Sequence, residues 1–293
     1  MAFLPVEKLK PGDSVAVVAP GGPFDPPVFE RGLAVIAARY RPVVQETVFD
    51  KHRYLAGTDD VRATDLQHAF SGEAKAIFTA RGGYGSSRLL TRVTFQPKAL
   101  VGFSDITSLH LAAQVAGLRS LHAPVITQLG TQPPEVAARL FDLLEGRAVE
   151  PLIGKETLHS GLAEGPLLGG NLSMLTRMLG TPYLPSFRGA ILLVEDIDER
   201  PYSLDRMWTH LALAGVLHEL AGIVLGDFGG CEEKDADYTG ADVLRDLVKD
   251  CPVPCVSGFA IGHGAINQPV VLGARVRLDA NTKTLTLLEG LAE

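Results

Sequence analysis

Short apolar runs that alternate with segments of helical spacing constrain the fold of this chain more than any other feature. In the first half, each run is bounded by turn residues or by the start of a helical pattern. Strands that alternate with helices indicate a parallel sheet covered by helices on both faces. We therefore predict an α/β fold with a parallel sheet of this kind. The runs that carry this prediction are Ser14–Ala19, Val43–Phe49, Ala76–Thr79 and Ala99–Gly102.

A second group of apolar runs and helical patterns starts near Leu162 and indicates a second domain. With 293 residues, the chain is long for one core, because single cores stop growing near about 250–300 residues. We expect an N-terminal domain over 1–140, a linker of mixed polar, Gly and Pro residues over 141–161, and a C-terminal domain over 162–293. Its expected strands are Ala190–Val194, Gly222–Leu225 and Val253–Phe259, and a closing hairpin is expected from Val270–Leu278 and Thr284–Leu288.

Composition and charge exclude several classes of function. Hydrophobic residues make up 46% and charged residues 21%, which is ordinary for a globular protein. The net charge of -7 is spread along the chain without a basic stripe, so no nucleic-acid partner is expected. The N-terminus lacks the pattern of a signal peptide, and the run Val15–Ala19 is too short to span a membrane. We therefore expect a cytoplasmic protein without a membrane partner.

Cysteine usage is consistent with that compartment. The chain has three cysteines, Cys231, Cys251 and Cys255. Cys251 and Cys255 are spaced like one of the two ligand pairs of a metal site, but the sequence has no second Cys/His pair that would complete it. We expect free or buried thiols and no metal.

Ser104 is the candidate nucleophile. The strand that ends at Gly102 is followed by Ser104-Asp105 and then by a helical pattern. At such a turn a serine hydroxyl points out of the sheet, and nearby backbone N–H groups can stabilise an oxyanion. The match to the G-x-S-x-G turn is imperfect, because Ile106 stands where a small residue is expected. Helix capping by Ser104 or Asp105 is the structural alternative.

A carboxylate and a histidine that could complete such a site also follow apolar runs. Glu195 and Asp196 come directly after a buried strand, and either could orient a histidine; a solvated acidic turn is the alternative. His263 has glycine on both sides, which leaves room around a potential general base. His110 and His122 compete for that role. The residues alone do not choose among them.

The turn Arg81-Gly82-Gly83-Tyr84-Gly85 is the last local motif. It lacks the spacing of a dinucleotide-binding loop and the Lys-Ser/Thr of a phosphate-binding loop. Its glycines could let the backbone approach a substrate and donate an N–H group. A plain strand-to-helix turn is the alternative.

Taken together, these segments resemble the LD-carboxypeptidase family, serine peptidases also called muramoyltetrapeptide carboxypeptidases. The resemblance implies that Ser104 is the nucleophile, Glu195 the carboxylate and His263 the base. It also implies oxyanion donors at the backbone N–H of Asp105 and, by inference, of Gly83. The motifs run through the chain in order as VAVVAPGGP, YLAGTDDVRATDLQHAF, ARGGYGSSRLL, VGFSDITSLHLA, LLGGNLSMLTRMLGTPYLP, ILLVEDIDERPYSLDRMWTHL, GFAIGHG and VVLGARVRLD.

The resemblance further implies a two-domain enzyme, with an N-terminal doubly wound α/β domain that carries Ser104 and a smaller C-terminal α/β domain that carries Glu195 and His263. It also implies a site between the domains, no metal or organic cofactor, and assembly as a homodimer. Its implied reaction is release of the terminal D-alanine from murein tetrapeptide during peptidoglycan recycling. Arg81 is a weak candidate for reading the terminal carboxylate.

Two alternatives remain. One is a related serine hydrolase that cleaves an acylated nucleotide or another amide-linked peptide. The family relative with nucleotide substrates carries extra loop material and an aromatic residue for the nucleotide, whereas the only tryptophan here, Trp208, lies in a helical pattern. That difference favours the cell-wall substrate. The other alternative is a non-catalytic module that binds a small ligand.

Overall fold

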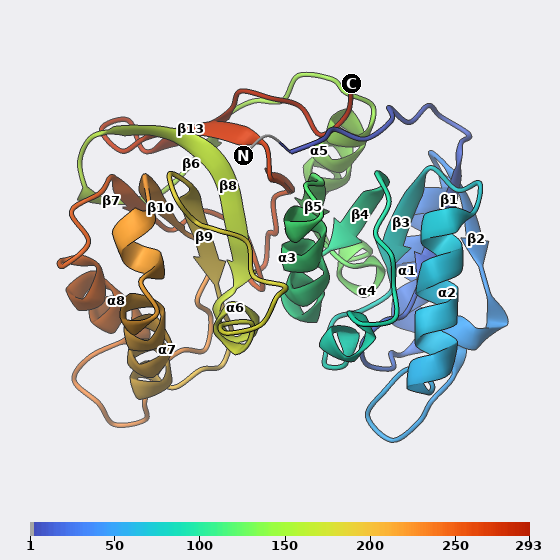
Figure 1. The fold of residues 1–293 in the computed structure, drawn as a ribbon, viewed down its shortest axis with the longest axis horizontal. Helices are drawn as coiled ribbons and strands as arrows, with labels where there is room; N and C mark the ends of the chain where they lie inside the picture. Colours follow the sequence, from blue (N-terminus) through green and yellow to red (C-terminus); the bar gives the residue numbers. More distant parts are fainter. Residues whose placement is uncertain (1–2) are drawn as a thin grey trace. The chain divides into compact units, whose positions relative to one another are not determined.

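The computed structural model describes residues 3–293, which form two compact units. Each unit has its own sheet (Figure 1). The chain passes from one unit to the other more than once. Unit 1 contains the chain as far as Val149, together with Gln268–Gly273 and Gly290–Glu293, and unit 2 contains Glu150–Asn267 and Ala274–Glu289.

Unit 1 holds a six-stranded sheet in the order β12-β5-β4-β3-β1-β2. Its first five strands in the chain run parallel, and only β12 pairs antiparallel, with β5. β3 and β4 are buried along their whole length, as expected of strands covered on both faces. The predicted doubly wound parallel sheet is confirmed. The strands are β1 (Ser14–Val18), β2 (Arg41–Val44), β3 (Ala76–Thr79), β4 (Ala99–Gly102), β5 (Ser120–His122) and β12 (Val270–Leu272).

The helices of unit 1 follow its strands in alternation. α1 packs against α4, and Thr58 caps α2 by accepting a hydrogen bond from the Val61 N–H. The helices are α1 (Pro26–Ala37), α2 (Asp59–Ser71), α3 (Thr107–Val115), α4 (Ile126–Leu129) and α5 (Pro134–Leu144), with short 3₁₀ turns η1 (Glu46–Phe49), η2 (Ser86–Leu89) and η3 (Ser104–Ile106).

Unit 2 holds an eight-stranded sheet in the order β6-β14-β13-β8-β9-β10-β11-β7. Its core is the parallel set β8, β9, β10 and β11, and antiparallel strands flank this set on both sides. This unit is the predicted second α/β domain. The strands are β6 (Leu152–Ile153), β7 (Glu156–His159), β8 (Leu162–Asn171), β9 (Ile191–Glu195), β10 (Gly222–Leu225), β11 (Cys255–Ser257), β13 (Arg275–Asp279) and β14 (Thr284–Leu287).

The helices of unit 2 are few, and α7 packs against both α6 and α8. They are α6 (Leu172–Arg177), α7 (Pro201–Leu213) and α8 (Gly240–Val248), with the 3₁₀ turn η4 (Val216–Glu219). Across residues 3–293, no helix of either unit has the length and apolar character that a membrane crossing requires.

Three sequence-based expectations differ from the observed elements. The strand predicted over Val43–Phe49 ends at Val44, and its second part is the turn η1. The hairpin strand predicted over Val270–Leu278 is divided at Gly273, which has φ 83°, so that β12 joins the sheet of unit 1 and β13 that of unit 2. The segment 141–161, expected as a linker, contains the end of α5 and the strands β6 and β7.

The three cysteines are free and buried, as predicted. Burial raises the pKa of Cys231 and of Cys255 to about 12, because a thiolate loses its hydration in the interior. These thiols are therefore inert at neutral pH.

Candidate active site

Ser104 lies on a strained turn at the carboxyl end of β4. The strand ends at Gly102, η3 starts at Ser104, and α3 follows directly. Ser104 has φ 66°, a left-handed conformation that side chains other than glycine rarely adopt. Such strain costs about 1–3 kcal/mol and persists mainly where function requires it. The predicted strand-turn-helix setting of this serine is confirmed.

The residues around Ser104 explain the imperfect match to the usual nucleophile turn. A Cβ added at Gly102 would lie 2.3 Å from Thr79 Oγ1 and 3.1 Å from the side chain of Ile106. Only glycine therefore fits at position 102. Ile106 is fully buried, so the position where a small residue was expected is filled by a core side chain.

The glycine turn after β3 lies directly against Ser104. A Cβ at Gly82 would be 2.9 Å from Ser104 Cβ, 3.0 Å from Ser104 Oγ and 3.5 Å from the backbone nitrogen of Asp105. The carbonyl of Gly82 accepts a hydrogen bond from the Gly22 N–H at 2.9 Å. Gly83 follows with φ 93°. Gly82 thus permits a close approach of the backbone to Ser104, which is more than a plain turn requires.

Asp105 has a structural side chain. It is 1% exposed, its Oδ2 accepts the N–H of Ser86 at 2.9 Å, and its carbonyl accepts the hydroxyl of Ser86 at 2.6 Å. Burial raises the pKa of Asp105, and the hydrogen bonds from Ser86 oppose that rise. Asp105 therefore fastens the turn of Ser104 to the segment after the glycine turn.

Glu195 and His263 form a hydrogen-bonded pair in unit 2. Glu195 ends β9 and is fully buried, and its Oε2 lies 2.6 Å from His263 Nδ1. A Cβ at Gly262, which has φ 120°, would be 2.5 Å from that oxygen. A Cβ at Gly226 would be 3.1 Å from Glu195 Cβ. The two glycines therefore leave the space that the carboxylate occupies.

The environment of His263 suits a general base. Burial lowers its pKa, but the hydrogen bond and charge of Glu195 and the charges of Asp196 and Asp227 outweigh burial, so the pKa is raised. Because a carboxylate only accepts, Nδ1 donates its proton to Glu195, and the lone pair of the neutral ring is then on Nε2. The side chain of His263 is 16% exposed, which keeps the ring accessible.

Asp196 serves another purpose. Its Oδ1 accepts from Asn171 Nδ2 at 2.9 Å, and its Oδ2 accepts from the N–H of Ser173 at 2.8 Å. Asn171 also caps α6 by accepting from the N–H of Met174 at 3.1 Å. Asp196 therefore holds the start of α6, whereas Glu195 holds the histidine. The role of Asn171 was missed from the sequence, although its position after Gly169-Gly170 before a helical run was a capping signal.

The two competing histidines are both fully buried in unit 1. His110 lies 2.9 Å from Ser120 Oγ through Nδ1 and 2.9 Å from the carbonyl of Gly102 through Nε2. Burial lowers its pKa to about 4. His122 stacks edge-on against Phe103, with ring centroids 5.7 Å apart. His110 and His122 are therefore packing residues of the core and not exposed bases.

A cavity of about 650 Å³ opens at the carboxyl edge of the sheet in unit 1. Its lining combines the aromatic rings of Phe24 and Phe49 with charged side chains of both signs, which are Lys51, Arg81, Asp25 and Asp50. Arg81 directly precedes the glycine turn and donates to the carbonyl of Pro23 at 2.5 Å. Open α/β sheets bind ligands at this edge, where the strand order reverses, here between β1 and β3.

A strained serine at a strand end and a buried carboxylate–histidine pair are the groups that serine hydrolases use for acyl transfer. The sequence profile of the LD-carboxypeptidase N-terminal domain matches residues 15–123, and that of the C-terminal domain matches residues 164–278. The chain belongs to the LD-carboxypeptidase family and is a serine-type carboxypeptidase.

Individual relatives match over nearly the full length. The probable murein peptide carboxypeptidase of Bacillus subtilis is 37% identical over 97% of this chain and 94% of its own. The crystal structure of muramoyltetrapeptide carboxypeptidase from Oxalobacter formigenes is similar with a TM-score of 0.84 at 29% identity, covering 94% of this chain and 97% of that one. The microcin C7 self-immunity protein MccF has a TM-score of 0.91 at 21% identity, covering 99% and 100%, and shares the fold.

Proposed function

We propose that this enzyme is an LD-carboxypeptidase that releases the terminal D-alanine from murein tetrapeptide, a step of peptidoglycan recycling. The proposal rests chiefly on the 2.6 Å contact between the buried Glu195 and His263. This contact orients His263 as the general base that a serine-type carboxypeptidase needs. The names of the relatives in Bacillus subtilis and Oxalobacter formigenes point to the same class of substrate.

In the proposed mechanism Ser104 Oγ attacks the carbonyl carbon of the bond before D-alanine. His263 Nε2 takes the hydroxyl proton, while Glu195 fixes the ring tautomer and offsets the charge of the imidazolium. The imidazolium then protonates the amine of D-alanine as the C–N bond breaks. Water attacks the acyl-enzyme with His263 again as base, which frees the tripeptide and restores Ser104.

The backbone N–H groups of Asp105 and Gly83 are the proposed donors to the oxyanion. The Asp105 nitrogen belongs to the same turn as Ser104, and it is within 3.5 Å of where a Gly82 side chain would begin. The turn that carries Gly83 therefore borders the same space. Removal of one such donor from a serine hydrolase costs about 10²–10³ in kcat.

Arg81 is the proposed reader of a substrate carboxylate. Its guanidinium is exposed in the cavity beside the glycine turn, and its hydrogen bond to Pro23 holds it there. We expect Arg81→Met to raise KM about tenfold or more, since a hydrogen bond to a charged group contributes about 1.5–3 kcal/mol. Arg81→Lys should fall between this variant and the wild type. An unchanged KM in Arg81→Met would remove this residue from the proposal.

We also propose that the enzyme acts in the cytoplasm as a homodimer. The free, buried cysteines fit a reducing compartment, and the family resemblance supports the dimer. Light scattering after gel filtration should give twice the mass of 31.2 kDa; the mass of one chain would refute the dimer.

Mass spectrometry of murein peptides incubated with the enzyme tests the activity. The wild type should convert tetrapeptide into tripeptide and free D-alanine, and Ser104→Ala should not. Hydrolysis of an aminoacyl adenylate with intact tetrapeptide would instead favour the nucleotide-directed alternative. Failure of a serine-directed phosphonate to label Ser104, together with no turnover of either substrate, would favour a binding module.

A further inference from the structure

Arg62, a buried cation on α2, connects the segments that surround Ser104. It is 2% exposed, and its Nη1 donates both to the carbonyl of Pro20 and, at 3.0 Å, to that of Gly85. Pro20 follows β1, and Gly85 ends the glycine turn after β3. One guanidinium therefore ties together two loops at the carboxyl edge of the sheet.

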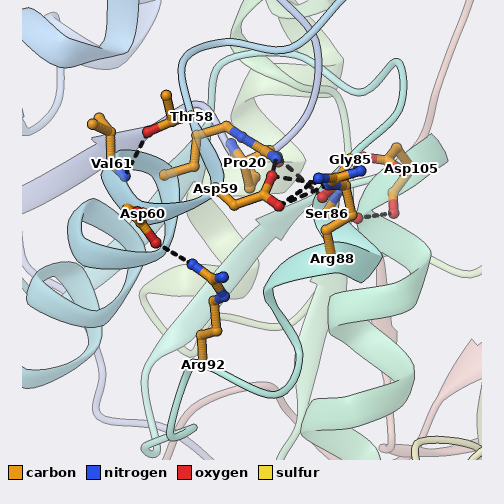
Figure 2. A network of polar contacts seen from close by, with 11 residues as sticks. Pro20, Thr58, Asp59, Asp60, Val61, Gly85, Ser86, Arg88, Arg92 and Asp105 are labelled. Carbon is orange, nitrogen blue, oxygen red and sulfur yellow. Dashed lines mark hydrogen bonds and ion pairs between the residues drawn. The ribbon is translucent and has the colours of Figure 1, made fainter. Parts of the chain in front are cut away.

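Asp59 holds this guanidinium in place. Its Oδ1 accepts from Arg62 Nη2 at 2.5 Å, and both its oxygens accept from Arg88 at 2.6–2.9 Å (Figure 2). The hydrogen bond from Arg88, and to a lesser extent that from Arg62, lowers the pKa of Asp59 against the effect of its partial burial. The carboxylate therefore stays ionised and keeps Arg62 aligned with its carbonyl acceptors.

The connection continues from Gly85 to the nucleophile. Gly85 has φ 132°, and a Cβ there would lie 2.7 Å from Arg62 Nη1, so its backbone sits directly on the guanidinium. The next residue, Ser86, donates its N–H and its hydroxyl to Asp105 (Figure 2). Asp105 is bonded to Ser104. An unbroken path of short contacts thus leads from Asp59 to the turn that bears the hydroxyl.

We propose that the Asp59–Arg62 pair is a positioning device for the oxyanion donors of Asp105 and Gly83. Arg62 touches the far end of the glycine turn, and through Ser86 it sets the place of the Asp105 N–H. A buried arginine with two carbonyl acceptors gives the two loops one defined spacing, because its planar fork donates in fixed directions. The inference rests on the proposed function for the substrate, for Ser104 as the nucleophile and for the two oxyanion donors.

Asp59→Asn tests the proposal, with Asp60→Asn as its matched control. Both carboxylates lie in the first turn of α2 and pair with an arginine, but Asp60 pairs with the exposed Arg92 and does not contact Arg62. We expect Asp59→Asn to lower kcat about 10–100-fold at nearly constant KM, because a small displacement of a catalytic group has effects of this size. Asp60→Asn should stay within about twofold of the wild type, since Arg62 keeps its partner.

Phosphonate labelling of Ser104 gives a second readout that does not depend on the peptide. The attack on phosphorus also develops charge on an oxygen, so Asp59→Asn should slow the labelling rate by a similar factor, and Arg62→Lys should do the same. Melting temperatures show whether each variant is folded at the assay temperature. A folded Asp59→Asn with wild-type kcat and labelling rate, or an equal loss in Asp60→Asn, would overturn the inference. If the wild type is labelled but releases no D-alanine, the proposed substrate fails while the labelling ratios still decide the inference.

Discussion

Gly262 and Glu195 lie so close that a single methyl group at position 262 would reach within 2.5 Å of the carboxylate oxygen that holds His263. The loop can therefore deliver the histidine to the carboxylate only if residue 262 has no side chain. Its φ of 120° adds a second reason for glycine.

Gly262→Ala should abolish most of the activity. The methyl group must displace Glu195 or the loop, and either movement breaks the pair with His263. Gly215→Ala is the control, because Gly215 has φ 81° in the same unit but nothing within 4 Å of its Cβ position. We expect both variants to lose about 1–2 kcal/mol of stability from the backbone conformation, but only Gly262→Ala to lose turnover. Equal rates in the two variants would contradict the role of this glycine.

Glu195→Gln should lower the rate of D-alanine release by roughly 10²–10⁴, because the amide removes the charge and can favour the wrong tautomer of His263. Asp196→Asn should retain far more activity. Its carboxylate accepts three hydrogen bonds, from Asn171, Ser173 and Ile197, so its main loss should be in melting temperature. An active Glu195→Gln beside an inactive, folded Asp196→Asn would show that the wrong carboxylate has been chosen.

The pH dependence of kcat/KM should report the raised pKa of His263. Only the neutral imidazole can accept the proton of Ser104, so the rate rises with pH through that pKa, above the ordinary histidine value of about 6.5. The loss of one negative charge in Asp227→Asn should shift the rise of kcat/KM to lower pH.

The free energy of unfolding should change with pH in the opposite direction to kcat/KM. The charged pair of His263 and Glu195 stabilises the fold below the unfolded-state pKa of the histidine, and this contribution is lost as pH rises through the folded-state pKa. NMR titration of the His263 ring measures its pKa directly. A midpoint of the rise in kcat/KM below pH 6.5 would contradict the raised pKa.

Ser104→Gly should separate stability from activity. Glycine adopts φ 66° without the strain that serine carries, so the variant should gain about 1 kcal/mol and melt at a higher temperature than Ser104→Ala. Neither variant has a nucleophile, and both should lose several orders of magnitude in rate. A Ser104→Gly protein no more stable than Ser104→Ala would show that the turn is not strained at this residue.

Local patterns in the sequence determined much of this protein. The continuous apolar runs identified β3 and β4, because a strand buried on both faces needs several consecutive apolar residues. A similar run identified β1, which is partly buried. The glycine and serine motifs identified the turn of Ser104, because turn geometry depends on a few neighbouring residues. The same signals marked Glu195 at a strand end and His263 in a glycine loop.

Only the tertiary structure decided which distant segments meet. Glu195 and His263 are 68 positions apart, and no local signal distinguishes Glu195 from Asp196 as the partner of the histidine. The return of β12 to the first sheet and the pairing of β6 with β14 depend on packing between segments far apart in the chain. The sequence around Arg62 predicts only a polar residue in a helix. Its burial beneath two loops follows from how α2 packs on the sheet. These contacts arise from three-dimensional complementarity, which hydrophobic periodicity and turn chemistry do not encode.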